Sequence, residues 1–82
     1  MELKDFQKVF ETRMFEMGTK MAQVWSMMYI VQRIGFSSPE ERRDFFSLVE
    51  EANRIHRETF GWDAYDLKLL SKKLAGHRRQ RA

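Results

Sequence analysis

Apolar residues recur at regular intervals along the first 34 residues of the chain. One row repeats every seven residues and a second row is offset from it by four, and together they hold Leu3, Phe10, Met17, Val24, Val31, Met14, Met21 and Met28. Alternating steps of three and four residues keep one face of an α-helix against a partner, as in a coiled coil. We therefore predict one long helix over about residues 2–34, which would span roughly 50 Å. We expect it to continue through Gly18, because no proline lies beside that residue.

The second half of this predicted helix is apolar on almost every side. Its apolar residues include Ala22, Val24, Trp25, Met27, Met28, Tyr29, Ile30 and Val31. A helix that is hydrophobic all round must be surrounded by other elements. Two shorter helices of the same chain can cover only part of it, so we expect the remainder to face a second copy of the chain or a different protein.

A strong start signal places a second helix soon after the first. Gly35 is suited to end the first helix, since a residue without Cβ adopts the left-handed conformation at little cost. Ser38 can then cap the next helix, Pro39 occupies its first position, and Glu41 follows three residues after the cap. These signals predict a second helix over about residues 39–60.

A third helix and a short tail complete the predicted organisation. Gly61 ends the second helix, and Asp63 provides an acidic start for a third helix over about residues 63–75. The fold class is therefore all-α, a helical bundle that we expect dimerisation to complete. Residues 1–76 form a single helical domain, and residues 77–82 form a basic tail that we expect to be mobile because it contains nothing apolar to pack.

Composition narrows the class of protein. The 82 residues are 43% hydrophobic and 33% charged, with one Pro and no Cys. This apolar fraction with charges of both signs favours a folded domain over a disordered chain. The absence of cysteine excludes disulfides and thiolate zinc sites. A domain of this size buries only about 60% of the surface that its unfolded chain exposes, so a second subunit is expected to add stability.

Export and membrane signals are not expected in this sequence. The first five residues carry charges of both signs and lead into no apolar region of the kind found in signal peptides. The longest uncharged stretch lies between Lys20 and Arg33, and it is shorter than the roughly 20 residues that cross a bilayer. We expect a cytoplasmic protein without membrane contact.

Few residues are arranged for catalysis or for metal binding. The histidines, His56 and His77, are far apart in the sequence and have no acidic residues at ligand spacing. In a helical dimer, Arg13, Lys20 and Arg33 could surround an anionic metabolite and catalyse electrostatically. Arg13 and Lys20 nevertheless fall on a row beside the apolar seam, where solvated charges usually lie. We therefore expect a protein that is not an enzyme and that holds neither a cofactor nor a metal.

The methionines of the first helix indicate a contact surface. Flexible thioether side chains suit an irregular core, and they equally suit a surface that adapts to a partner. The leading hypothesis is a non-enzymatic interaction module that acts as a homodimer and serves as an adaptor, inhibitor or regulator of a larger protein. The predicted partner-binding residues are Met21, Trp25, Met28, Tyr29 and Gln32.

The charge of the C-terminal quarter leaves an alternative open. Residues 62–82 contain six Lys or Arg and two Asp. Such a segment can contact nucleic-acid phosphates, although the same charges also complement a helix C-terminus and keep a protein soluble. The alternative hypothesis is a small dimeric nucleic-acid-binding regulator that uses Lys68, Lys72, Lys73, Arg78, Arg79 and Arg81.

Overall fold

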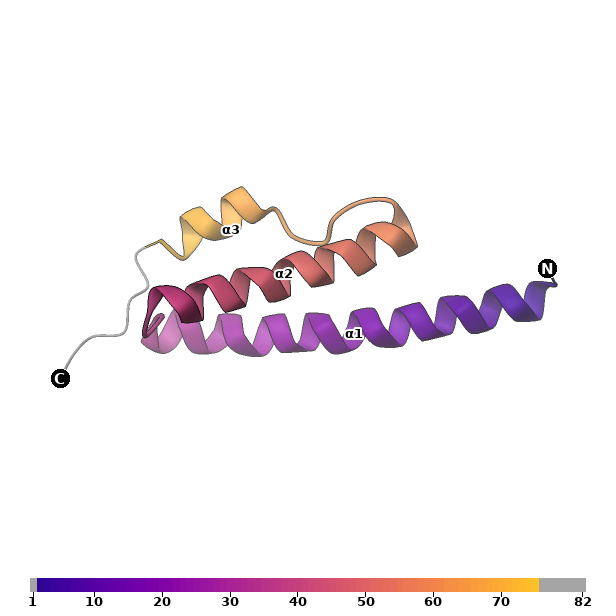
Figure 1. Ribbon diagram of the computed structural model, residues 1–82, viewed down its shortest axis with the longest axis horizontal. Helices are drawn as coiled ribbons and strands as arrows, with labels where there is room; N and C mark the ends of the chain where they lie inside the picture. Colours follow the sequence, from indigo (N-terminus) through magenta and orange to yellow (C-terminus); the bar gives the residue numbers. More distant parts are fainter. Residues whose placement is uncertain (1, 76–82) are drawn as a thin grey trace.

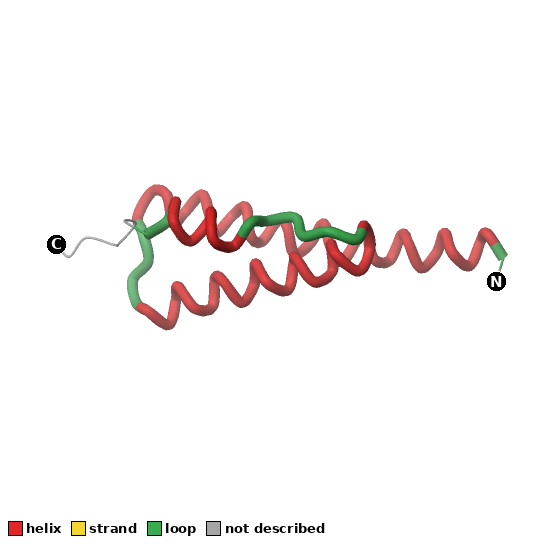
Figure 2. The backbone as a smooth tube through the Cα atoms, turned by 90° about the horizontal axis from the view of Figure 1, so that it is seen from above, coloured by secondary structure: helices red, strands yellow, loops and turns green. Residues whose placement is uncertain are grey.

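The computed structural model describes residues 2–75, and over that range the chain is a helical hairpin with a short third helix. Helix α1 runs over Leu3–Ile34, α2 over Pro39–Phe60 and α3 over Leu67–Lys73. Helices α1 and α2 lie side by side and antiparallel (Figure 1). Seen from above, the loop after α2 and then α3 run back over this hairpin (Figure 2). The all-α prediction is confirmed, and the first two helices have the predicted bounds to within one residue.

The apolar seam of α1 is buried where it meets α2 and α3. All three helical regions contribute to the core, whose buried apolar members are Met17, Val24, Met28, Val31, Phe36, Phe45, Val49, Ala52, Ile55, Leu70 and Leu74. Leu3 and Phe10 belong to the same seven-residue row but stay exposed. The reason is that α2 ends beside Phe10, whose ring lies 6.3 Å from that of Phe60. The start of α1 therefore projects beyond the rest of the molecule (Figure 1).

The local cap signals at Gly35, Ser38 and Gly61 place these helix ends correctly, but Gly35 combines its positive φ with a ψ of −179° and so does not adopt the left-handed helical conformation that we expected. The Ser38 hydroxyl accepts a hydrogen bond from the Glu41 N–H at 3.1 Å, and Gly35 and Gly61 end their helices with φ of 73° and 92°. Helix α1 passes through Gly18 without a break. Within residues 2–75 no helix has the combination of length and apolar character that a bilayer crossing requires.

The third helix begins later than the sequence predicted. We expected it to start at about residue 63, but residues 61–66 form a loop and α3 begins at Leu67. Asp66 is the residue that caps it, because its carboxylate accepts from the Leu69 N–H at 3.1 Å. Asp63 instead forms an ion pair with Arg57 at 2.7 Å, which anchors the loop to α2.

A buried amide on α2 explains why the loop is not helical. The Asn53 side chain donates to the Tyr65 carbonyl at 3.0 Å and accepts from the Tyr65 N–H at 2.8 Å. Both backbone groups of Tyr65 are thus bonded to α2 rather than to a helical turn. The predicted mobile tail, residues 77–82, lies outside the residues that the structure describes.

Candidate partner-binding groove

A groove of about 500 Å³ opens between the second half of α1 and α3. The α1 wall holds Trp25, Met28, Tyr29 and Gln32. The opposite wall comes from α3 and the segments around it, through Ala64, Tyr65, Asp66, Leu69, Leu70, Lys73 and Leu74. Four of the five residues predicted as a partner surface thus lie in one groove. The fifth, Met21, is partly buried and packs against the core.

The groove has an apolar floor and an exposed aromatic rim. Met28 and Leu70 are buried beneath it, whereas Trp25, Tyr29 and Leu69 leave 61%, 58% and 50% of their surface exposed. Trp25, Met28, Tyr29 and Gln32 share one face of α1, because they follow one another in steps of three, one and three residues. Large aromatic side chains that remain exposed beside a concave apolar surface are typical of recognition sites.

The charged residues of the groove lie on its α3 side. Asp66 and Lys73 flank that wall with opposite charges, and the guanidinium of Arg33 lies 4.8 Å from the centre of the Tyr29 ring. An apolar segment lying in the groove would therefore find polar groups at its edges. This arrangement resembles the polar rim that surrounds the apolar centre of protein interfaces.

Tyr65 adds an unpaired polar group to the wall. Its hydroxyl is buried and has no hydrogen-bond partner among the described residues, and desolvation by burial raises the pKa of the Tyr65 phenol above its usual value. An unsatisfied buried hydroxyl costs about 1 to 3 kcal/mol. This wall of the groove is therefore not optimised for the stability of the chain alone.

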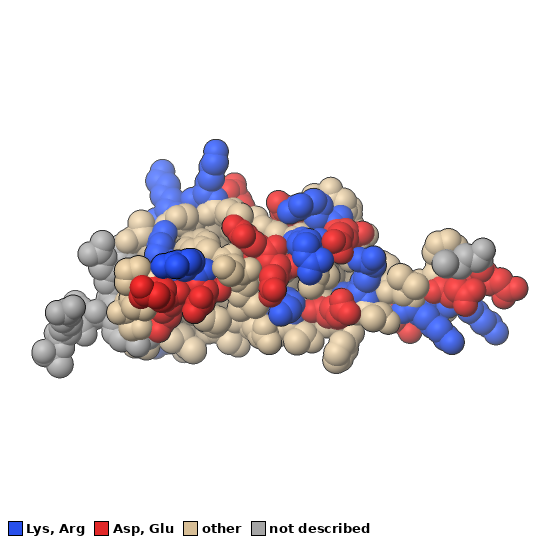
Figure 3. Space-filling model, in the orientation of Figure 1, with Lys and Arg blue, Asp and Glu red and all other residues tan. Residues whose placement is uncertain are grey.

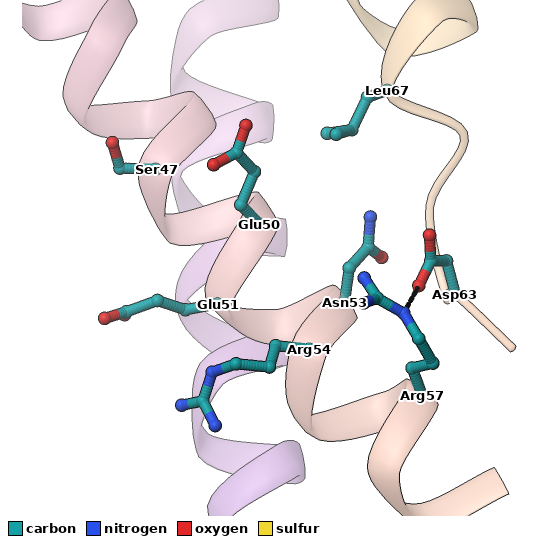
Figure 4. A pocket seen from close by; sticks show the side chains of 8 residues that line it. All are labelled: Ser47, Glu50, Glu51, Asn53, Arg54, Arg57, Asp63 and Leu67. Atoms are coloured by element: carbon teal, nitrogen blue, oxygen red, sulfur yellow. Dashed lines mark hydrogen bonds and ion pairs between the residues drawn. The ribbon is translucent and has the colours of Figure 1, made fainter. Parts of the chain in front are cut away.

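A second groove, of about 570 Å³, runs along α2 and the loop that follows it (Figure 4). Its lining is mostly charged and consists of Ser47, Glu50, Glu51, Asn53, Arg54, Arg57, Asp63 and Leu67. Arg57 reaches Asp63 across the groove at 2.7 Å (Figure 4). Several of these charges are thus already paired within the chain.

The charged groove holds no arrangement that we can assign to catalysis. Within residues 2–75 no hydrogen bond joins Ser47 to a base, and an isolated serine hydroxyl is a weak nucleophile. The same residues contain no group of three His, Asp or Glu side chains placed to hold a metal ion. His56 lies elsewhere, with Nδ1 2.6 Å from the Trp62 carbonyl oxygen.

The candidate anion-binding cations of α1 contact carboxylates of α2 or an aromatic ring. Arg13 pairs with Glu58 at 3.0 Å and Lys20 with Glu51 at 3.1 Å, and Arg33 lies over Tyr29 as described above. The hydrogen bond from Arg13, followed by the contact with Arg54, holds the pKa of the Glu58 carboxyl below its usual value. Both ion pairs lie at the surface, so Arg13 and Lys20 join α1 to α2 instead of lining a common pocket, and Arg33 contacts a ring of its own helix.

The lysines of the nucleic-acid hypothesis separate into two places. Lys68 and Lys72 line a shallow surface between α2 and α3, whereas Lys73 lines the groove beside α1. Lys and Arg side chains stand out above α3, but over α2 they alternate with Asp and Glu (Figure 3). The other three predicted residues, Arg78, Arg79 and Arg81, lie outside the described part of the chain.

The sequence pattern missed the residues that build the second wall. Leu69 and Ala64 belong to a wall whose position depends on the Asn53 contacts with Tyr65, and those contacts join residues twelve positions apart. No helical periodicity signals such a link. Comparison with known proteins adds no family assignment, because no protein-family profile, no curated protein and no solved structure matches the chain.

Proposed function

We propose that the protein is a non-enzymatic interaction module that binds an apolar segment of a larger protein in the groove between α1 and α3. The observation that carries this proposal is the exposure of Trp25, Tyr29 and Leu69 around a floor of buried core residues. Binding at this groove would make the protein an adaptor, inhibitor or regulator of its partner.

An amphipathic helix is the segment that we expect in the groove. Helices bind apolar grooves through side chains spaced three and four residues apart, and the α1 wall offers residues with a matching spacing. Trp and Tyr are enriched among the residues that dominate binding energy. Burial of Trp25 and Tyr29 by such a helix would therefore supply much of the affinity.

The test compares two tryptophans that are about equally exposed in the free chain. Trp25 lies in the groove, and Trp62, which is 63% exposed, lies in the loop after α2. We expect wild-type protein and the Trp62→Ala control to capture the same partner from extracts of the native host, and Trp25→Ala to lose it. Circular dichroism would verify that both variants are folded. Equal capture by all three proteins would contradict the proposal.

A second candidate function, nucleic-acid binding, is favoured by the free lysines of α3. Within residues 2–75 no ion pair engages Lys68 or Lys72, so these ammonium groups are available to phosphates. Titration with duplex and single-stranded DNA at two salt concentrations tests this, because log affinity should fall by about 0.9 per phosphate contact for each tenfold rise in salt. Deletion of residues 77–82 should abolish such binding and leave capture by the groove unchanged. Absence of binding at low salt would exclude this candidate.

A further inference from the structure

The start of α1 presents a second apolar surface, which is separate from the groove. We call it the N-terminal overhang and define it as residues 3–10. Its apolar side chains Leu3, Phe6 and Phe10 are 83%, 57% and 48% exposed. They follow one another in steps of three and four residues, so they share one face of the helix. Exposed apolar residues gathered on one face indicate an interaction surface.

This face continues the seam that α2 covers farther along α1. The next residues of the same row, Met17 and Val24, are buried at 5% and 0% exposure. The cover stops near Phe10, where the Phe60 ring at the end of α2 packs against Phe10. The ion pair between Arg13 and Glu58 lies just inside that boundary. The overhang thus has the sequence of a buried seam without the helix that would bury it (Figure 1).

We propose that a second copy of the chain covers this face, overhang against overhang, with the two α1 helices antiparallel. Sterics favour this direction. The end of α2 lies beside Phe10, where the Phe60 ring packs against it. A second α1 lying parallel on the exposed seam would extend from there into the space that α2 already fills (Figure 1). An antiparallel α1 starts beside Phe10 and runs away from α2. Each overhang then lies against the other chain's overhang, in the space just past the end of that chain's α2.

The ends of the helices suit this arrangement. In the antiparallel pair, the α1 of the second copy begins where α2 ends at Phe60. The start of a helix carries a partial positive charge and its end a partial negative charge, and their approach is favourable. The α1 of the second copy therefore lies in line with α2, with its dipole in the same direction, and covers the part of the apolar seam that α2 leaves exposed.

The charges beside the overhang are complementary in the same orientation. Residues 2–13 carry three positive and three negative side chains, so two copies meet without net repulsion. Antiparallel pairing places residues of the same flank opposite each other, and Lys4 and Glu11 share one flank of α1 by their helical spacing. Lys4 of each copy then faces Glu11 of the other.

The size of the contact predicts a weak dimer. A helical segment of eight residues is about 12 Å long, and it covers less than the roughly 800 Å² per partner of a standard interface. We therefore expect monomers and dimers to exchange at micromolar concentrations. Because the overhang and the groove are different surfaces, the dimer can be tested independently of the proposed function.

The first test places one charge on each of two exposed phenylalanines of α1. Phe6→Glu changes the overhang face, and Phe15→Glu is the control, because Phe15 is 77% exposed and its helical spacing puts it on the opposite side of the helix from Phe6. In sedimentation equilibrium, we expect Phe6→Glu to weaken dimerisation by about tenfold or more and Phe15→Glu to leave it unchanged. A wild-type chain that stays monomeric at high micromolar concentration would overturn the proposal, and so would a dimer that tolerates Phe6→Glu.

The second test reads the direction of the two helices. The chain contains no cysteine, so a single Gln7→Cys substitution supplies the only thiol, near the twofold axis of the proposed pair. A short thiol-reactive crosslinker should join two Gln7→Cys chains. It should not join two Thr19→Cys chains, whose thiols would lie more than about 30 Å apart. Crosslinking of Thr19→Cys equal to that of Gln7→Cys would exclude the antiparallel pair.

A charge exchange completes the test. Lys4→Glu should weaken the dimer, because it puts two carboxylates opposite each other, and the further substitution Glu11→Lys should restore it. Restoration requires that the two positions face each other in the pair. A double variant that is as weak as Lys4→Glu alone would overturn the proposed register.

Discussion

Asn53 holds the loop and the third helix in place, although the hydrophobic pattern of the sequence assigns it no role. Among residues 2–75 it is the buried polar side chain, at 1% exposure. Its amide bonds both backbone groups of Tyr65, and this contact sets where the second wall of the groove lies. Hydrophobic periodicity identifies apolar faces, but it cannot identify a polar residue whose partner is the backbone of a distant loop.

Removal of this amide should be costly. Asn53→Ala leaves the N–H and the carbonyl of Tyr65 without their partners, and we expect the free energy of unfolding to fall by about 2 to 3 kcal/mol. Urea denaturation measures the change. Gln23→Ala removes an exposed amide from α1 and should change stability by less than about 0.5 kcal/mol. A loss no larger for Asn53→Ala than for this control would show that the contacts contribute little.

Glu58 makes the stability of the hairpin depend on pH. Its pKa lies below the usual 4.5, chiefly because of the hydrogen bond from Arg13, so folding favours the ionised carboxylate. The resulting stability is present above the unfolded pKa and is lost as the pH falls through the folded pKa. We expect wild-type protein to lose more stability than Glu58→Gln as the pH falls below 4.5. The side chain is exposed, so the difference should be small and should disappear in high salt. Identical pH profiles at low salt would contradict this assignment.

Helices are predictable here where their signals are local. The caps at Gly35, Ser38 and Gly61 involve neighbouring residues, and the structure has the first two helices where those signals place them. The predicted start of α3 was wrong by four residues, because Asp63, which resembles a cap in the sequence, pairs with Arg57 instead. A local cap signal does not reveal the tertiary ion pair of Asp63, because that contact depends on how the loop packs against α2.

Gly18 inside α1 and Gly61 directly after α2 provide a matched pair of substitutions. A Cβ added at Gly18 or at Gly61 would meet no atom within 4 Å, but Gly61 has a φ of +92°. Gly18 lies inside α1, where alanine is favoured by about 1 kcal/mol, so Gly18→Ala should raise the melting temperature. Gly61→Ala should lower it, because the left-handed conformation is strained for a residue with Cβ. An unchanged or lowered melting temperature for Gly18→Ala would indicate that another chain approaches Gly18 closely.

The molecule as a whole is unevenly packed along its length. Three helical regions surround the core at one end, and α1 alone forms the other end (Figure 1). The sequence indicated that α1 has more apolar surface than the chain can cover, and Trp25 and Tyr29 remain exposed accordingly. It could not divide that surface between the groove and the overhang. The division depends on where α2 ends relative to α1, which follows from the packing of the two helices and not from the pattern of either one.

Amide hydrogen exchange should show this uneven packing directly. In the buried half of α1, exchange requires the hairpin to open, whereas a projecting helical segment without tertiary contacts is only marginally stable. We expect residues 7–10 to exchange much faster than residues 24–31 in dilute solution. If the overhangs pair, exchange at residues 7–10 should slow as protein concentration rises, and Phe6→Glu should abolish that slowing. Equal protection along α1 at high dilution would mean that the overhang is stabilised within a single chain, and the need for a second copy would disappear.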